Sequence, residues 1–139
     1  EMKYFNLVFF TAILSFNLSA AHHEEDEQKG ISGLVSSEVF DLAGEMDLYV
    51  ERYQSCGDTN NEKHYHPVGT LVYMLDGKAA SISSGEWKEY SEGSYWFEPS
   101  MWVHGGSMTD EPKFGDDQCR QTLVIRASRK GEEPTVFVK

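Results

Sequence analysis

Short runs of alternating apolar and polar residues, punctuated by turn residues, fill most of the chain. Residues 39–42 predict a first strand, and the alternation of Met46, Leu48 and Val50 with polar neighbours predicts a half-buried second strand. Further short strands are predicted at 70–75, 78–84, 87–90, 95–97, 102–108, 122–127 and 135–138. No stretch beyond the N-terminal apolar run shows helical amphipathicity over three turns. The pattern therefore predicts an all-β domain, an antiparallel sandwich or barrel.

Two turn signals and one long loop divide these strands. Asp76-Gly77 is a strong signal for a hairpin turn, so the strand at 78–84 is expected to return alongside the strand at 70–75. The pair at 84–85 predicts the next turn, and the polar stretch 109–118 is the longest loop.

The N-terminal segment has the pattern of an export signal. Lys3 precedes an apolar run over residues 4–16, and residues 19–21 are small enough for signal cleavage. The run is shorter than the roughly 20 residues of a membrane-spanning helix. The sequence thus predicts a periplasmic or secreted protein, with a signal peptide at 1–21, an acidic flexible leader at 22–34 and the folded domain at 35–139.

The charge of the chain limits its partners. It carries 23 acidic and 12 basic side chains, a formal net charge of −11. This charge argues against nucleic acid, or a membrane surface after signal removal, because like charges repel. The expected partner is a small-molecule substrate, and a homodimer remains open.

Cys56 and Cys119 are the two cysteines of the chain. An even number of cysteines in an oxidising compartment favours a disulfide. Two free thiols, or one metal site that uses both thiolates, are the alternatives, although neither cysteine has Cys-x-x-Cys spacing.

Three of the five histidines fall into two segments that fit one metal site. Side chains of a strand alternate faces, so His64 and His66 point the same way, about 6–7 Å apart along the backbone. Their imidazoles can bind one divalent ion. His104, from a distant strand, can supply the third ligand and leave positions open for water or substrate.

These segments resemble the two motifs of the cupin family of jelly-roll barrels. The matching residues are Gly57, His64, His66 and Gly77 in the first motif, with one extra residue before His64, and Gly93, Pro99 and His104 in the second. Departures from the motifs are Thr70 in place of a glutamate, Met101 in place of a glycine and Met108 in place of an asparagine. The resemblance covers residues 57–108 and implies a jelly-roll barrel of two antiparallel sheets, with His64, His66 and His104 as metal ligands.

Thr70 at the glutamate position implies a site of three neutral imidazoles. Such a site leaves a divalent ion its full charge, which favours an anionic chelating substrate. The pattern is similar to that of three-histidine cupin dioxygenases, in metal ligation only. Iron is the preferred ion for redox chemistry, and nickel, manganese, copper and zinc are alternatives.

Two carboxylates near the motifs are candidate replacements for the missing glutamate, in a supporting catalytic role. Glu62 lies two residues before His64, and Glu98 lies at a bend from which it can orient a ligand histidine. Both also fit the pattern of ordinary solvated acids, and no carboxylate is expected among the metal ligands. The aromatic residues near the motifs are expected mainly to pack in the core, with one or two shaping a pocket: Tyr73, Tyr95, Trp96, Phe97 and Trp102.

The sequence thus predicts an exported, metal-binding cupin. The leading function is a dioxygenase-like oxidoreductase that acts on a small chelating organic anion. The alternatives are a metal-dependent lyase, isomerase or hydrolase that uses the ion as a Lewis acid, and a non-catalytic protein that binds a small ligand or a metal.

Overall fold

All regular secondary structure of the described residues is β-strand. The structure, a computed structural model, describes residues 33–57 and 61–139. In this part of the chain the strands are β1 (Gly33–Leu42), β2 (Met46–Cys56), β3 (His64–Tyr65), β4 (Thr70–Asp76), β5 (Lys78–Ser81), β6 (Lys88–Ser91), β7 (Tyr95–Glu98), β8 (Cys119–Arg129) and β9 (Val136–Phe137). The predicted signal peptide 1–21 and leader residues 22–32 lie outside the described residues, and β1 begins two residues before the predicted start of the domain. No helix within the described ranges has the length and apolar character needed to cross a membrane.

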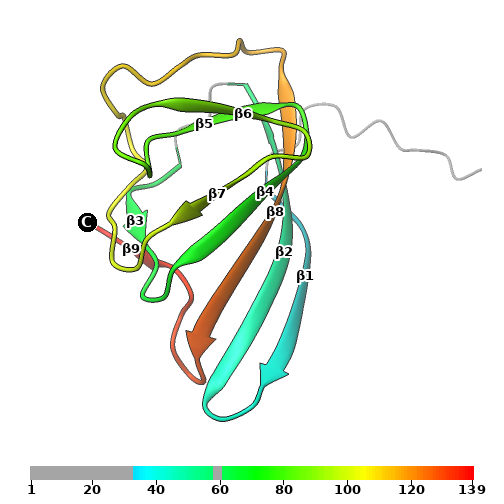
Figure 1. Cartoon of the computed structure of the whole chain (residues 1–139), viewed down its shortest axis with the longest axis vertical. Coiled ribbons are helices and arrows are strands. Elements are labelled where there is room, and N and C mark those ends of the chain that lie inside the picture. The colour runs from blue at the N-terminus through cyan, green and yellow to red at the C-terminus, as the bar shows by residue number, and fades with distance from the viewer. Residues whose placement is uncertain (1–32, 58–60) are drawn as a thin grey trace, which may run out of the picture.

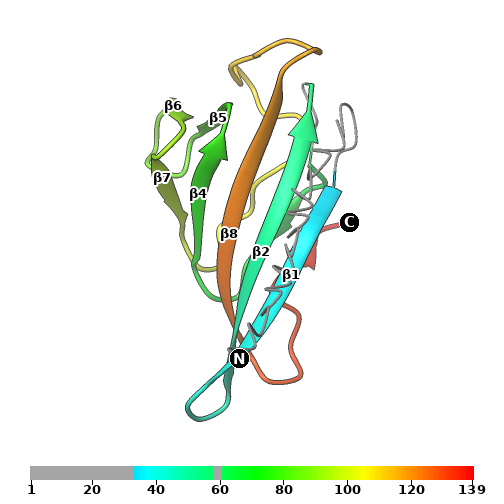
Figure 2. The ribbon, with the colours of Figure 1, turned by 90° about the vertical axis from the view of Figure 1, so that its right-hand side faces the viewer.

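One large sheet and two small sheets build the fold. The large sheet is antiparallel, with strand order β1-β2-β8-β4-β7, while β3 pairs with β9 and β5 pairs with β6. Figure 1 shows both small sheets beside the large one, and Figure 2 shows the twist of the large sheet. The predicted all-β architecture of antiparallel strands is confirmed. Its second layer is divided into two separate two-stranded sheets.

The predicted hairpin at Asp76-Gly77 is wrong. β4 pairs with β7 and β8, whereas β5 pairs with β6 in another sheet. Gly77 has a φ of +76°, and a Cβ on it would lie 2.5 Å from the carbonyl oxygen of Cys119. Only glycine fits such a turn against the start of β8. The chain therefore leaves the large sheet at Gly77, and the predicted turn at 84–85 closes the β5–β6 hairpin, with Gly85 N–H donating to the Ile82 carbonyl at 2.9 Å.

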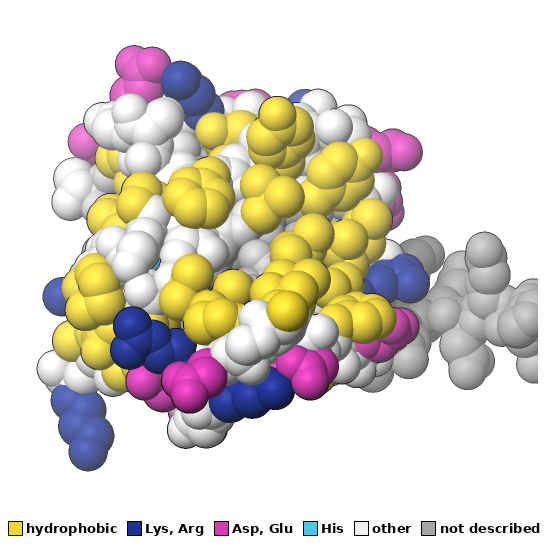
Figure 3. All heavy atoms as spheres, turned by 60° about the horizontal axis from the view of Figure 1, so that its bottom comes forward, with side chains coloured by type: hydrophobic (Ala, Val, Ile, Leu, Met, Phe, Trp, Pro, Cys, Tyr) yellow, Lys and Arg dark blue, Asp and Glu magenta, His cyan; other side chains and the backbone are white. Residues whose placement is uncertain are grey.

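The interior is a cavity lined by both polar and apolar side chains rather than a dry apolar core. Tyr49, Glu51 and Tyr53 of β2 line this cavity, so the alternate apolar residues of the strand face outward. The buried hydrophobic residues of the described ranges are few: Val72, Met74 and Ala79. Large hydrophobic side chains are exposed instead on the edge strands β1 and β7, among them Leu34, Val39, Phe40, Tyr95 and Phe97. Figure 3 shows hydrophobic side chains gathered over one face of the molecule.

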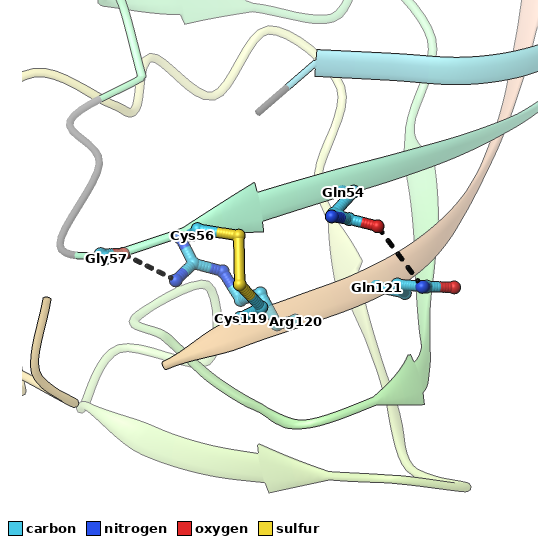
Figure 4. The surroundings of a disulfide bond; sticks show 6 residues. All are labelled: Gln54, Cys56, Gly57, Cys119, Arg120 and Gln121. Atoms are coloured by element: carbon cyan, nitrogen blue, oxygen red, sulfur yellow. Dashed lines mark hydrogen bonds between the residues drawn. A yellow bond between two sulfur atoms is a disulfide. The ribbon is translucent and has the colours of Figure 1, made fainter. Parts of the chain in front are cut away.

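A disulfide joins two neighbouring strands of the large sheet. Cys56 ends β2, Cys119 begins β8, and the two are cross-strand partners with Cα atoms 4.0 Å apart. Figure 4 shows Arg120 beside the bond, where its guanidinium donates to the Gly57 carbonyl at 3.3 Å. The predicted pairing is confirmed. It ties the segment that leads to His64 to the end of the loop that follows His104.

Candidate metal centre

The backbone holds His64 and His104 opposite each other. The two residues form an isolated antiparallel bridge, with His64 N–H donating to the His104 carbonyl at 2.8 Å and His104 N–H donating back at 2.9 Å. The strand predicted at 102–108 is reduced to this single bridge. His66 follows His64 by two residues, on the same side of the chain. Two segments that are distant in sequence thus deliver their imidazoles to one place.

A tight turn after β7 aims the second segment at the first. Met101 N–H donates to the His66 carbonyl at 2.8 Å, and Trp102 N–H donates to the Pro99 carbonyl at 3.2 Å. Met101 has a φ of +62°, in the left-handed region that costs an L-residue about 1–2 kcal/mol. The glycine that the cupin motif carries here would adopt this conformation freely. Met101 therefore holds this turn in a conformation that glycine adopts at lower cost.

The three histidines form one compact cluster. Their candidate ligand atoms all lie within 4.8 Å of one another. His66 is buried, and His64 and His104 are half-buried. The ring of Trp102 stacks on that of His104, with centroids 4.4 Å apart and an interplanar angle of 8°. This group can hold a metal ion, and the predicted ligand set is therefore brought together.

Hydrogen bonds orient all three imidazoles in the same sense. Nδ1 of His64 lies 2.6 Å from the Glu62 carbonyl, that of His66 3.0 Å from the Pro134 carbonyl, and that of His104 2.9 Å from the Trp102 carbonyl. A carbonyl oxygen only accepts, so each Nδ1 must carry a proton. Each neutral ring then presents the lone pair of Nε2, which is the arrangement that second-sphere hydrogen bonds give metal-ligating histidines.

Glu98 enters the same cluster from the end of β7. Its Oε2 lies 3.2 Å from Nε2 of His66 and 3.2 Å from Nε2 of His104. Its Oε1 accepts a hydrogen bond of 3.0 Å from the Trp96 indole. The residue is only 9% exposed. Glu98 is therefore not the ordinary solvated acid that the sequence left as one interpretation.

The environment changes the acidity of these groups. Burial alone would raise the pKa of Glu98, but hydrogen bonds from His104 and His66 outweigh it and lower the pKa to about 2. Burial would lower the pKa of His104, yet the neighbouring Glu98 carboxylate raises it above its ordinary value. For His64 burial prevails and lowers the pKa, which favours the neutral imidazole that a metal ion requires.

A cavity of about 590 Å³ opens beside the cluster. Its wall includes the three histidines, Glu98, the aromatic rings of Trp96 and Trp102, and the polar face of β2. Such a volume suits a small molecule. Of the predicted aromatic set, Trp96 and Trp102 therefore shape the pocket, whereas Tyr95 and Phe97 are exposed.

A buried ionic network forms part of the cavity wall. Arg126 pairs with Glu51, and its guanidinium donates to the Thr135 hydroxyl and, at 3.1 Å, to the Tyr53 hydroxyl. The Thr135 hydroxyl in turn lies 3.3 Å from Nδ1 of His66. The sequence reasoning missed this network. The sequence pattern that could have indicated it is the spacing of Tyr49, Glu51 and Tyr53, which places three polar side chains on one face of a strand.

The two predicted carboxylates have different places. Glu62 lines the cavity and is exposed, and it contacts the cluster through its main-chain carbonyl, which accepts from His64. Glu98 contacts two ligand histidines through its side chain. The structure thus separates two acids that the sequence treated alike.

Comparisons with known proteins match the chain by structure alone. No family model matches it, and no curated protein sequence does. An uncharacterised protein with a double-stranded β-helix domain from Klebsiella pneumoniae shares 15% identity over 81% of this chain and 87% of its own, with a TM-score of 0.48. The polyketide cyclase RemF from Streptomyces resistomycificus shares 16% identity over 75% and 82%, with a TM-score of 0.48. An RmlC-like cupin from Shewanella frigidimarina shares 15% identity over 69% and 87%, with a TM-score of 0.45.

The fold of this chain is cupin-like, as its sequence predicted. Antiparallel strands surround a cavity, and the histidines of the two motifs meet at its wall. This description of the fold rests on the strands, the cavity and the histidines of this chain.

Proposed function

We propose that this protein is an exported, metal-dependent enzyme that acts on a small organic molecule in the cavity beside His64, His66 and His104. The leading reaction is a dioxygenase-like oxidation of a chelating organic anion. One observation carries the proposal: three imidazoles, each with Nδ1 bonded to a main-chain carbonyl, converge within 4.8 Å at the cavity wall. Export is supported by the apolar run at 4–16 and by the disulfide.

The donor set fits a divalent first-row metal ion. Imidazole nitrogens suit iron, nickel, copper and zinc, and three protein ligands leave positions open for other molecules. A bound iron ion would supply the ligation of the anion and the activation of dioxygen. The protein supplies the neutral tautomers and the fixed ring positions, since each hydrogen-bond acceptor on Nδ1 belongs to the main chain.

The wall of the cavity offers groups that orient a substrate. Arg126 is a buried cation on this wall, and its Nε has no hydrogen-bond partner among the described residues. The positive charge of this guanidinium favours a ligand that carries an oxygen-bearing, electron-rich group. Trp96 and Trp102 supply apolar surface on the same wall. The cavity therefore suits a small molecule with an oxygen-bearing head and an apolar body.

A Lewis-acid reaction is the second candidate, because the cavity also offers a proton donor. The Tyr53 hydroxyl accepts from Arg126 and lies 3.2 Å from Oε2 of Glu51. Burial raises the pKa of Tyr53, so the hydroxyl keeps its proton at neutral pH. A lyase, isomerase or hydrolase would use such a group as a general acid.

The metal dependence of turnover separates the two reaction classes. Protein loaded anaerobically with Fe²⁺ or with Zn²⁺ is mixed with a panel of 1,3-diketones and mercaptocarboxylic acids, and oxygen uptake and substrate loss are recorded. The oxidoreductase predicts stoichiometric oxygen uptake with iron and none with zinc, and His66→Ala should abolish it. Substrate loss with zinc in the absence of oxygen would support the Lewis-acid reaction instead. Binding of panel compounds without turnover under either metal would contradict both.

A further inference from the structure

Glu98 and Thr70 stand directly opposite each other in the pairing of β7 with β4. Side chains of cross-strand partners share one face of the sheet, with Cβ atoms about 4.5–5.5 Å apart. Thr70 occupies the position at which the cupin motif carries a glutamate. The carboxylate of Glu98 therefore lies on the adjacent strand, at the position that pairs directly with Thr70.

Thr70 itself offers no substitute for the missing carboxylate. It is completely buried, and its Oγ1 has no hydrogen-bond partner among the described residues. Glu98, by contrast, reaches the cluster, with Oε2 at 3.2 Å from Nε2 of both His66 and His104. Among the described residues, the carboxylate that contacts these ligand nitrogens therefore comes from β7.

The orientation of the Glu98 carboxylate matches that of the ligand histidines. Its Oε1 is held by the Trp96 indole at 3.0 Å, which leaves Oε2 directed at the cluster. Each ligand histidine is likewise held through Nδ1, which leaves Nε2 directed at the cluster. Trp96 thus orients the carboxylate of Glu98, as the main-chain carbonyls orient the imidazole rings.

The Oε2 atom of Glu98 needs either a proton on a facing Nε2 atom or a metal ion beside it. With Nδ1 protonated, a neutral imidazole directs the lone pair of Nε2 toward Oε2 of Glu98. A carboxylate that faces two lone pairs is repelled, and burial leaves little water to screen the repulsion. One divalent ion between Glu98, His66 and His104 satisfies all of these atoms at once.

We infer that Glu98 is a fourth protein ligand of the metal ion, supplied by β7 in place of the carboxylate that Thr70 lacks on β4. The inference rests on the proposed metal centre, and it replaces the sequence-based expectation of a ligand set without a carboxylate. A carboxylate ligand reduces the formal charge of the centre from +2 to +1. The site is then less electrophilic than three histidines alone would make it.

The test compares Glu98 with a glutamate that lies outside the cavity. Zn²⁺ is titrated by calorimetry into wild-type protein, Glu98→Gln and the control Glu89→Gln, a variant of an exposed glutamate on β6 that does not line the cavity. Glutamine is nearly isosteric with glutamate and keeps an acceptor for Trp96, so circular dichroism should show both variants folded. We expect Glu98→Gln to bind Zn²⁺ at least ten-fold more weakly than wild type, and Glu89→Gln to bind with unchanged affinity.

A crystal structure of the Zn²⁺-bound wild type decides the role directly. A Glu98 oxygen at about 2.0–2.2 Å from the ion makes Glu98 a ligand. A Zn²⁺ ion on the three histidines with both Glu98 oxygens beyond about 3 Å would overturn this inference and leave the proposed metal centre intact. Wild type that takes up no Zn²⁺ would overturn both.

Discussion

Glu51 and Arg126 form an ion pair between β2 and β8, and each side chain is only 9% exposed. The pair lies inside the cavity and includes the Tyr53 hydroxyl and the Thr135 hydroxyl in its hydrogen bonds. Removing one charge from a buried pair leaves the other uncompensated. The network thus links two strands of the large sheet to the wall of the cavity beside the histidine cluster.

Replacing one member of this pair should destabilise the fold strongly. We expect Arg126→Met to lower the free energy of unfolding by about 3–5 kcal/mol, because Glu51 would remain buried without its counter-charge. The double variant Glu51→Leu with Arg126→Met should recover most of that loss. Urea unfolding of the single and double variants measures both values. Additive losses in the double variant would contradict a coupled pair.

An exposed arginine provides the control for this experiment. Arg52 of β2 is exposed and donates to Oε1 of Gln121 at 3.1 Å. Arg52→Met should change the free energy of unfolding by no more than about 0.5 kcal/mol, as expected for a surface site.

Loss of the disulfide should weaken both the fold and the metal centre. Cys56 and Cys119 are separated by 63 residues, and closing a loop of this length stabilises by about 4 kcal/mol in the chain-entropy model. We expect the double variant Cys56→Ala with Cys119→Ala to melt at a lower temperature. Its affinity for Zn²⁺ should also fall, since the bond anchors the segments that lead to His64 and away from His104. Calorimetry measures both quantities, and an unchanged Zn²⁺ affinity would contradict this anchoring role.

Stability should depend on Tyr53 at alkaline pH. Burial raises the pKa of Tyr53 above its ordinary value of 10.0, so the folded protein holds this proton more tightly than the unfolded chain. The stability that protonated Tyr53 contributes is complete below pH 10 and is lost as the pH rises through the pKa of Tyr53 in the folded protein. The gap in unfolding free energy between wild type and Tyr53→Phe should therefore narrow between pH 9 and pH 11.5. A gap that stays constant or widens over this range would contradict the assignment.

The sequence predicted the cluster of His64, His66 and His104 because the pattern that identifies these residues is local. His64 and His66 share a face by strand alternation, and the spacing of Gly93, Pro99 and His104 marks the second motif. The three imidazoles do meet in the structure. Glu98 was predicted to support a ligand histidine, but its closeness to two of them depends on the β4–β7 pairing, which no local pattern encodes.

The same limit explains the wrong hairpin and the missed network. The chain does turn at Asp76-Gly77. A local turn signal does not determine which strands pair with β4, and in the structure these are β7 and β8. The alternation in β2 predicted the strand correctly. The alternation did not show that the polar face of β2, which carries Glu51, points into the cavity. A buried charge needs a partner, and for Glu51 that partner is Arg126 on β8, distant in sequence.

The metal content of the purified protein tests the central claim most directly. Protein expressed with residues 1–21 is purified without chelators, and metals are quantified by mass spectrometry for wild type, His66→Ala and the control His22→Ala, a histidine outside the predicted site. The account predicts about one equivalent of a single divalent metal in wild type and in His22→Ala, and less than about a tenth of an equivalent in His66→Ala. Metal-free wild type that also fails to take up added Fe²⁺ or Zn²⁺, or undiminished metal in His66→Ala, would contradict it.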